Sequence, residues 1–477
     1  MGAAAMKARN PRTGEEDYDF LESSREEIAA TAARLREAQG EWDTIGPAGR
    51  AVVLTRFADA IDAHAAEIAG ALAVDTGRGT VSMIEVQGCA GNIRRWAQRG
   101  PELFDRLDVE AHPSATPGVE IVTNYSAFPL FGAIAPWNFP VILSHIDAVP
   151  ALMAGCAALV KPSEVTPRFV EPMRKVLAEV PELPLAYVMG AADVGQALIE
   201  EVDYVCFTGS TATGRKVAEA AARALIPANL ELGGKDPMII TASAEPDWAA
   251  GVALRASVVA TGQACQSIER VYVAREIAEP FLKALVAAAE RVELTWPDAA
   301  KGHLGPFIFA AQADKVQAHI DDARNHGARV LTGGEVEVLG GGKYLRPTVL
   351  ADVTPQMTVM REETFGPVIP VTIYDDIEDA IAQANDTEYG LSAAVLAGSL
   401  DEATAVGVRL DAGAISLQDG AMTSFVGDAT NQSRGCSGLG PSRMGDTGML
   451  RFLRERALIR QMGDPLPIDA YAERGEG

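Results

Sequence analysis

The chain has 477 residues, of which 48% are hydrophobic and 22% are charged. This length predicts two or three compact units, and this composition is typical of a globular protein rather than a disordered or fibrous one. The formal net charge of −24 argues against nucleic acid or an anionic membrane surface as a partner, because both require a basic face.

Five cysteines are scattered along the chain without a CxxC pair, which indicates neither a disulfide framework nor a zinc site and favours a reducing compartment. The first residues lack the apolar segment of a secretory signal, and no apolar run reaches the roughly 18 residues of a membrane span. We therefore expect a cytoplasmic protein that holds no metal. The cysteines are Cys89, Cys156, Cys206, Cys265 and Cys436.

Apolar residues three or four positions apart predict helices through most of residues 18–106, most clearly at 25–39 and 47–74. From Val119 onward the pattern changes to the alternating and short apolar runs that strands require. A run of three glycines, 340–342, is expected to form a surface hairpin.

Two sets of alternating strands and helices follow, which predict two α/β domains with parallel sheets covered by helices on both faces. The first set has strands at 132–135, 157–161 and 204–208 with helices at 140–153, 168–180 and 211–225. The second set has strands at 271–274, 368–373, 392–396 and 414–417 with helices at 277–292, 377–384 and 401–409.

Cys265 is a candidate nucleophile within residues 262–266, GQACQ. A lone cysteine is more often a buried structural thiol, and none of the six histidines lies in a motif that would complete a cysteine hydrolase. Glu231 is a better partner, because a carboxylate can act as a general base and Gly233 and Gly234 allow close approach of the backbone.

Asn138 lies in the segment Pro-Trp-Asn-Phe-Pro, 136–140, between a predicted strand and a predicted helix. The two prolines stiffen the turn and fix the direction of the Asn138 amide. A fixed amide donor is what an oxyanion hole requires, although this segment alone is equally consistent with a structural turn.

Three further segments have the composition of a dinucleotide site. Residues 207–214 close a strand and open a helix with glycines and hydroxyls that suit a pyrophosphate, but they lack the Lys-Ser/Thr of a Walker loop. Lys161 and Glu164, after another strand, can reach ribose hydroxyls or are simple surface charges. Glu363 can bond a sugar and Phe365 can stack on a flat ring, unless their segment is an ordinary turn.

In this order and spacing the segments resemble those of the aldehyde dehydrogenase superfamily, from Asn10 to about Arg456. The resemblance implies a Rossmann-like cofactor domain, an α/β catalytic domain and a small bridging β-hairpin near residues 110–126. We expect residues 1–108 and 128–233 to form the dinucleotide-binding domain and residues 234–440 the catalytic domain. Residues 109–127 and 441–477 are expected to bridge subunits of a homodimer or homotetramer.

The resemblance also implies a role for each site residue and a non-acylating, hydrolytic reaction. Cys265 is similar to the nucleophile that attacks an aldehyde, Glu231 to the base that activates water against the resulting thioester, and Asn138 to an oxyanion donor. Lys161 and Glu164 are similar to adenosine-ribose ligands, Gly209 and Ser210 to the pyrophosphate turn, and Glu363 and Phe365 to nicotinamide-ribose contacts. The remaining implied cofactor contacts are Trp137, Gly195, Phe207 and Leu232.

NAD is expected in preference to NADP, because the Glu164 carboxylate would bond a free 2′-hydroxyl and repel a 2′-phosphate. The presence of Glu231 disfavours acyl transfer to coenzyme A. The presence of both Cys265 and Glu231 disfavours a catalytically silent relative used as a structural or binding protein. Simple esterase activity can accompany the main reaction, since it needs only the nucleophile and the oxyanion donors.

Two features bear on the substrate. Ile142 and Ile146 recur at helical spacing beside Phe139, and no arginine is placed to bind a second carboxylate. These features predict an apolar or aromatic aldehyde as substrate, but the same residues are equally consistent with an ordinary face of the hydrophobic core. Gln418 stands where many relatives have Asn, and residues 431–436 replace a Pro-Phe-Gly-Gly stretch that normally shapes the aldehyde entrance.

Overall fold

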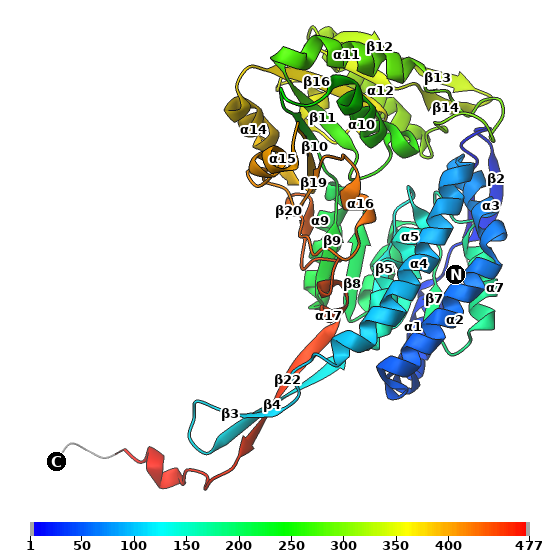
Figure 1. Ribbon diagram of the computed structural model, residues 1–477. Helices are drawn as coiled ribbons and strands as arrows, with labels where there is room; N and C mark the ends of the chain where they lie inside the picture. The colour runs from blue at the N-terminus through cyan, green and yellow to red at the C-terminus, as the bar shows by residue number, and fades with distance from the viewer. Residues whose placement is uncertain (1–3, 474–477) are drawn as a thin grey trace.

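The computed structural model describes residues 4–473, so the outermost ends of the predicted segments 1–108 and 441–477 lie outside the described residues. Two α/β halves stack on each other, and a narrow arm of strands projects from the lower one, at its end away from the upper half (Figure 1). One half contains a six-stranded sheet and the other a seven-stranded sheet. The predicted α/β fold with two parallel sheets is confirmed.

The first half is built around the sheet β21-β9-β8-β5-β6-β7, in which β5 to β9 run parallel and β21 is antiparallel to β9. Every residue of β6 and β8 is buried, as expected for parallel strands covered on both faces. The strands are β5 (Leu130–Ile134), β6 (Ala157–Lys161), β7 (Leu185–Tyr187), β8 (Tyr204–Thr208), β9 (Ala228–Glu231) and β21 (Gly438–Leu439). The helices are α1 (Arg25–Thr44), α2 (Gly46–Ala63), α3 (Ala65–Thr76), α4 (Gly79–Phe104), α5 (Pro140–His145), α6 (Ala148–Ala154), α7 (Val170–Glu179), α8 (Ala192–Glu201), α9 (Thr211–Ala224) and α17 (Thr447–Leu450).

The second half is built around the sheet β12-β15-β16-β11-β10-β18-β19, in which only the edge strand β12 is antiparallel to its neighbour. The main strands are β10 (Asp236–Ile240), β11 (Ile268–Ala274), β12 (Arg329–Thr332), β15 (Thr348–Ala351), β16 (Val368–Tyr374), β18 (Ser392–Leu396) and β19 (Ala414–Leu417). The helices are α10 (Pro246–Val258), the 3-10 turn η1 (Val259–Gly262), α11 (Arg275–Glu290), α12 (Ala310–Asn325), α13 (Thr358–Arg361), α14 (Ile377–Asn385), α15 (Leu400–Gly407) and α16 (Met422–Phe425).

Three pairs of short antiparallel strands complete the fold. The glycines 340–342 turn the predicted hairpin between β13 and β14, which confirms that expectation. The pairs are β1 (Ala5–Arg9) with β2 (Glu16–Leu21), β13 (Val336–Leu339) with β14 (Gly342–Leu345), and β17 (Tyr389–Gly390) with β20 (Arg434–Gly435).

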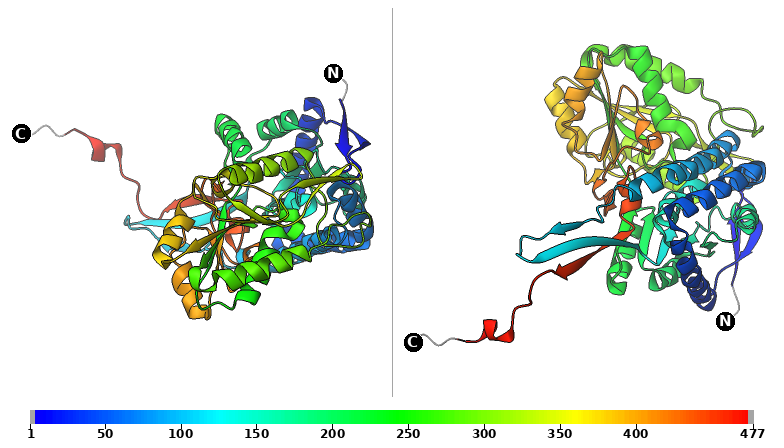
Figure 2. Two further views of the ribbon diagram at one scale, coloured as in Figure 1. Left: turned by 90° about the horizontal axis from the view of Figure 1, so that it is seen from above. Right: turned by 60° about the horizontal axis from the view of Figure 1, so that its bottom comes forward.

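The projecting arm joins two distant parts of the chain. The predicted hairpin of β3 (Ala111–Pro113) and β4 (Val119–Ala127) is present, and β22 (Leu453–Gln461) pairs with β4 along nine residues. Figure 2 shows the arm extending well beyond the two halves, with the final 3-10 turn η2 (Ile468–Tyr471) beyond it.

Three predicted helical stretches differ from the structure. Residues 18–21 lie in β2, because the sequence EDYDFL alternates between exposed and half-buried side chains as a strand does. The stretch 47–74 breaks at His64, where the backbone leaves the helical region. The stretch 140–153 breaks at Asp147, whose carboxylate binds two distant arginines instead of capping α6.

Among residues 4–473, we find no helix with the length and apolar character that crossing a membrane would need.

Candidate active site

The predicted site residues gather where the carboxyl ends of the first sheet meet the amino ends of the second. In the first sheet, β6 ends at Lys161 and β9 ends at Glu231, and Asn138 follows β5 by four residues. In the second sheet, β11 begins just after Cys265 and β16 just after Phe365. Figure 1 shows β8 and β9 below β10 and β11, with the link from β9 to β10 crossing between them. Ligands of open α/β sheets bind at the carboxyl ends of the strands, which is the edge that this junction uses.

Two glycines bring the Glu231 segment against the segments that carry Cys265 and Glu363. A Cβ added to Gly234 would lie 3.0 Å from the Cys265 carbonyl oxygen, and one added to Gly233 would lie 2.7 Å from the Glu363 carboxyl group. The Gly234 N–H also donates to Glu363 Oε1 at 3.2 Å. Side chains at these two positions would therefore separate the three segments, as the sequence predicts.

The Asn138 side chain is buried and directed at the loop before Cys265. Its Nδ2 donates to the backbone oxygen of Gln263 at 3.0 Å. Buried Arg78 donates to the Asn138 carbonyl oxygen, and Glu85 Oε1 accepts from the N–H of Val141 at 2.7 Å. The predicted stiff turn is thus held by two buried charged side chains of α4 and its N-terminal end, which the sequence analysis did not single out.

The loop that carries Cys265 has an uncommon backbone. Ala260, Thr261 and Gly262 all have positive φ, at 56°, 63° and 65°. For a residue other than glycine this conformation costs roughly 1–2 kcal/mol. A Cβ at Gly262 would overlap the Gly366 carbonyl, so this position requires glycine for close packing as well. Long-range packing therefore holds the nucleophile loop in a conformation that local preferences disfavour.

The predicted pyrophosphate turn lies directly beside the predicted base. The Gly209 N–H donates to the Glu231 backbone oxygen at 3.0 Å, and Ser210 caps α9 by accepting from the Thr213 N–H at 3.3 Å. A Cβ at Gly214 would overlap the Leu232 side chain, and one at Gly209 would lie 2.5 Å from the ring of Phe207. The exposed first turn of α9 thus presents backbone N–H groups next to Glu231, as an anion site requires.

The predicted ribose ligands lie together at the end of β6. Lys161 is buried, and its Nζ donates to Glu164 Oε2 at 3.2 Å. Burial lowers the pKa of Lys161, while Glu164 opposes that effect. Gly195 on α8 faces the Lys161 stem, since a Cβ there would lie 3.7 Å from its Cδ.

The aromatic ring of Phe365 is fixed on the opposite side of the site. Trp137 and Phe365 meet edge to face with ring centroids 5.5 Å apart. Glu269 accepts from the backbone N–H groups of Thr364 and Phe365, each at 2.7 Å, and binds Lys235 Nζ at 2.6 Å. The buried pair of Lys235 and Glu269 therefore holds the 363–365 turn. The sequence analysis assigned no role to Lys235 or Glu269.

Three acidic or thiol groups at the junction have raised pKa values. Burial and the carboxylates of Glu363 and Asp236 raise the pKa of Cys265 to about 12, and Arg443 opposes them. Burial and Glu269 raise the pKa of Glu363 to about 7. Burial also raises the pKa of Glu231, again opposed by Arg443. A thiol with this pKa is protonated at neutral pH, so a positive charge or a base must assist its ionisation.

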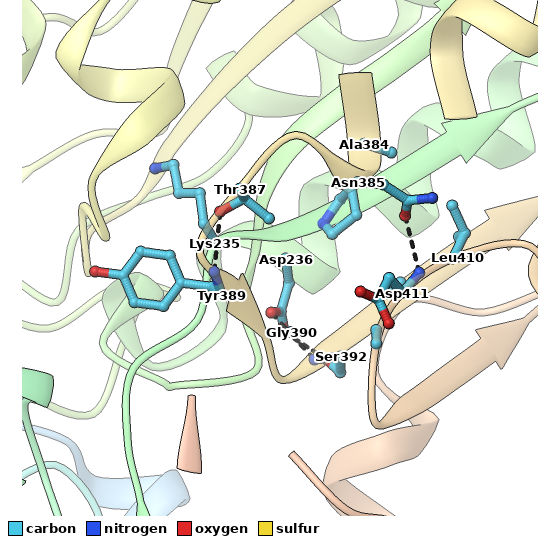
Figure 3. A pocket seen from close by; sticks show the side chains of 13 residues that line it. Lys235, Asp236, Ala384, Asn385, Thr387, Tyr389, Gly390, Ser392, Leu410 and Asp411 are labelled. Atoms are coloured by element: carbon cyan, nitrogen blue, oxygen red, sulfur yellow. Dashed lines mark hydrogen bonds between the residues drawn. The ribbon is translucent and has the colours of Figure 1, made fainter. Parts of the chain in front are cut away.

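Figure 3 shows a small pocket at the amino ends of β10 and β18, beside this junction. Lys235, Asp236, Tyr389 and Ser392 are among its lining residues. Asp236 Oδ1 accepts from the Ser392 N–H at 3.2 Å, and burial raises the pKa of Asp236 well above its usual range. None of Asn138, Glu231 and Cys265 lines this pocket.

The atypical C-terminal segment contacts Glu231, the predicted base. Ser433 Oγ donates to Glu231 Oε2 at 3.2 Å, and Gly438 in β21 pairs with Glu231 in β9. The Gln418 side chain instead bonds the backbone of Ala397. Its Oε1 accepts from the Ala397 N–H, and its Nε2 donates to the Ala397 carbonyl oxygen, each at 2.9 Å. Among the described side chains, no hydrogen bond joins the Cys265 thiol to the Glu231 carboxylate.

Comparison with known proteins identifies the family. The model of the aldehyde dehydrogenase family matches residues 2–458. The chain belongs to this family. It is an oxidoreductase that acts on aldehydes, and the resemblance seen in the motifs is confirmed.

Three proteins that are similar to this aldehyde dehydrogenase differ in the substrate and cofactor that they are named for. A protein of Mycolicibacterium smegmatis, provisionally named succinate-semialdehyde dehydrogenase [NADP(+)], is 36% identical over 96% of this chain and 89% of its own length. The solved structure of the aldehyde dehydrogenase PutA from Anabaena variabilis has a TM-score of 0.94 and 45% identity, covering 97% of this chain and 99% of its own. Betaine aldehyde dehydrogenase from Staphylococcus aureus, in complex with NAD+, has a TM-score of 0.90 and 27% identity, covering 97% and 93%.

Proposed function

We propose that this enzyme oxidises an aldehyde to the carboxylic acid, with Cys265 as nucleophile, Asn138 as oxyanion donor and Glu231 as the base for hydrolysis. The observation that carries this proposal is the close approach at Gly233 and Gly234, which gathers the segments of Glu231, Cys265 and Glu363 at one junction. A nucleophile, a donor and a base on three distant segments meet only where the chain permits such contact.

In the first half of the reaction, the Cys265 thiolate adds to the aldehyde carbon, and a C–S bond and an oxyanion form. Within residues 4–473 Asn138 Nδ2 makes one hydrogen bond, to Gln263, and its second hydrogen is available to the oxyanion. A dinucleotide held by Lys161, Glu164 and the turn at Gly209 and Ser210 would supply the hydride acceptor for this carbon. A thioester then remains on Cys265.

In the second half, water attacks the thioester carbon while Glu231 takes a proton from it. The C–S bond breaks, the Cys265 thiolate leaves, and the carboxylic acid is released. The raised pKa of Glu231 suits a group that must accept a proton, because a carboxylate of ordinary pKa is a weak base at neutral pH.

We propose NAD as the preferred cofactor. Its support is Glu164, whose carboxylate lies against Lys161 at the predicted ribose position and would repel a 2′-phosphate. The M. smegmatis relative carries NADP(+) in its name, whereas the S. aureus structure contains NAD+, so the relatives favour neither cofactor.

We propose an aldehyde with an apolar or aromatic side chain, supported by the half-buried Phe139 and Ile146 that flank α5. Ile142, predicted to join them, packs instead against the core of the first half, which favours a structural role for that residue. The relatives named for succinate semialdehyde and betaine aldehyde act by name on charged aldehydes, so the test must include both kinds.

An aldehyde panel with product analysis tests the proposal. We expect NADH formation and a carboxylic acid as product, with benzaldehyde and long aliphatic aldehydes oxidised at higher kcat/KM than succinate semialdehyde. Cys265→Ala is the control and should abolish NADH formation. A thioester product in the presence of coenzyme A would contradict the hydrolytic assignment, and a clear preference for semialdehydes would contradict the apolar substrate.

A further inference from the structure

One buried arginine outside the predicted site faces the Glu231 carboxylate. Arg443 lies four residues beyond β21, and its side chain is only 8% exposed. Its Nε is 3.8 Å from Glu231 Oε1. The Glu231 side chain is 18% exposed, so this pair is better shielded from water than an exposed ion pair and its two charges interact more strongly.

Arg443 is fixed by groups on two other elements. Its Nη2 donates to Asp147 Oδ2 at 2.5 Å and to Thr208 Oγ1 at 2.6 Å, and its Nε donates to Asp147 Oδ1 at 3.3 Å. Asp147 lies at the start of α6, and Thr208 is the last residue of β8. A planar guanidinium bound by two carboxylate oxygens and a hydroxyl has little freedom to turn away from Glu231.

The charged groups that affect the pKa of Glu231 are Arg443, Asp147 and Arg451. Arg451 also binds Asp147, from the start of the arm, so two arginines share one carboxylate. The only neutral partner of the Glu231 side chain among the described hydrogen bonds is Ser433. The thiols of Cys206 and Cys265 lie near enough for the Glu231 charge to affect them. Of these neighbours, Arg443 most strongly opposes the rise of the pKa of Glu231 that burial causes.

We propose that Arg443 is a positioning residue for Glu231, a guanidinium anchored by Asp147 and Thr208 that holds the carboxylate in place for hydrolysis of the thioester. This inference rests on the proposed role of Glu231 as the base. Among residues 4–473 no hydrogen bond joins Arg443 to the Cys265 sulfur, although its charge also lowers the pKa of that thiol, so we expect its larger effect in the second half of the reaction.

The acetylated enzyme isolates that half of the reaction. Mixing with 4-nitrophenyl acetate acetylates Cys265 and releases nitrophenolate, which stopped-flow absorbance records, and intact-mass measurement then follows loss of the acetyl group. In Arg443→Gln we expect deacetylation to slow more than acetylation does, and at a pH below the pKa of Glu231 a shift of one unit in that pKa slows deacetylation about tenfold. Loss of the nearby positive charge disfavours the carboxylate, so the acid limb of the deacetylation profile should move to higher pH.

Three further variants make the result interpretable. Arg443→Lys keeps the charge without the planar fork, and should restore part of the rate and most of the pH limb. It also carries the test if Arg443→Gln does not fold, in which case slowed deacetylation with a pH limb like that of the wild type supports the inference, and a wild-type rate of deacetylation contradicts it. Arg99→Gln is the matched control, because Arg99 forms a two-point pair with Asp446 of the same C-terminal segment and should behave as wild type. Glu231→Gln must slow deacetylation.

The outcomes separate the two proposals. If Glu231→Gln deacetylates as fast as wild type, the assignment of the base fails, and the role of Arg443 fails with it. If Glu231→Gln is slow but Arg443→Gln resembles wild type, only the role of Arg443 is overturned. A parallel loss of acetylation and deacetylation in Arg443→Gln, with an unmoved pH limb, would indicate a merely structural residue and would also overturn it.

Discussion

At the scale of single residues, the proposed preference for NAD depends on charge at the end of β6. Lys161 is buried beside Glu164, and Glu22, at the end of β2, adds a second negative charge in range of the lysine. Two carboxylates against one ammonium leave a net negative environment. A 2′-phosphate would bring further negative charge into it, whereas a 2′-hydroxyl can donate to a carboxylate.

Glu164→Ser is therefore expected to lower the preference for NAD. We expect the ratio of kcat/KM for NAD to that for NADP to fall about tenfold, since roughly 1.4 kcal/mol of lost discrimination corresponds to that factor. Steady-state kinetics with both cofactors measure it. Glu171→Ser, which removes an exposed glutamate on α7, should leave the ratio unchanged. A wild-type enzyme that uses both cofactors equally would show that Glu164 does not reach the ribose.

At the scale of elements, the turn before β16 depends on a residue at the start of β11. Both carboxylate oxygens of Glu269 accept hydrogen bonds, one from the backbone N–H of Thr364 and one from that of Phe365. Phe365 has a positive φ of 56°. The turn therefore needs two acceptors to stay in a conformation that its own residues disfavour. β11, the strand that follows Cys265, thus orients the turn that carries Glu363 and Phe365, the predicted nicotinamide-ribose contacts.

Glu269→Gln replaces one of these acceptors by an amide that can only donate. Leaving a buried N–H unsatisfied costs about 1–3 kcal/mol, so we expect KM for NAD to rise roughly tenfold as the turn shifts. Hydrolysis of 4-nitrophenyl acetate needs no cofactor and should be unchanged. The exposed Glu279→Gln on α11 serves as control. An equal loss of ester hydrolysis would mean that Glu269 supports the Cys265 loop instead.

At the scale of the whole molecule, the arm offers an open strand edge. β22 pairs with β4 on one side, and its side chains are almost all exposed, including Ile459 at 73%. An exposed edge strand with apolar side chains is a common site of association with another chain. The segments 109–127 and 441–477 were predicted to bridge subunits, and this remains a prediction.

We expect the wild-type enzyme to be a dimer or tetramer and Ile459→Lys to reduce its mass in light scattering. A charge on this strand must be desolvated if the strand meets another copy, which disfavours association. Val338→Lys is the matched control, because Val338 is similarly exposed, at 68%, but lies on β13, away from the arm. A monomeric wild type, or an unchanged mass in Ile459→Lys alone, would contradict the role of the arm.

The sequence by itself determined the local elements and the identity of the motif segments. The predicted strands at 157–161, 204–208 and 392–396 match β6, β8 and β18 residue for residue, because fully buried strands leave continuous apolar runs between breakers. The need for glycine at Gly233 and Gly234 was also predictable, since a backbone without Cβ is the usual way to let a second backbone approach.

Only the tertiary structure decided which distant side chains meet. Asp147 and Arg443 are 296 residues apart, and Glu269 and Phe365 are 96 residues apart. The order of strands within each sheet fixes these pairs, and periodicity along the chain carries no information about that order. For the same reason the helix break at Asp147 was missed, because the arginines that hold its carboxylate come from the last part of the chain.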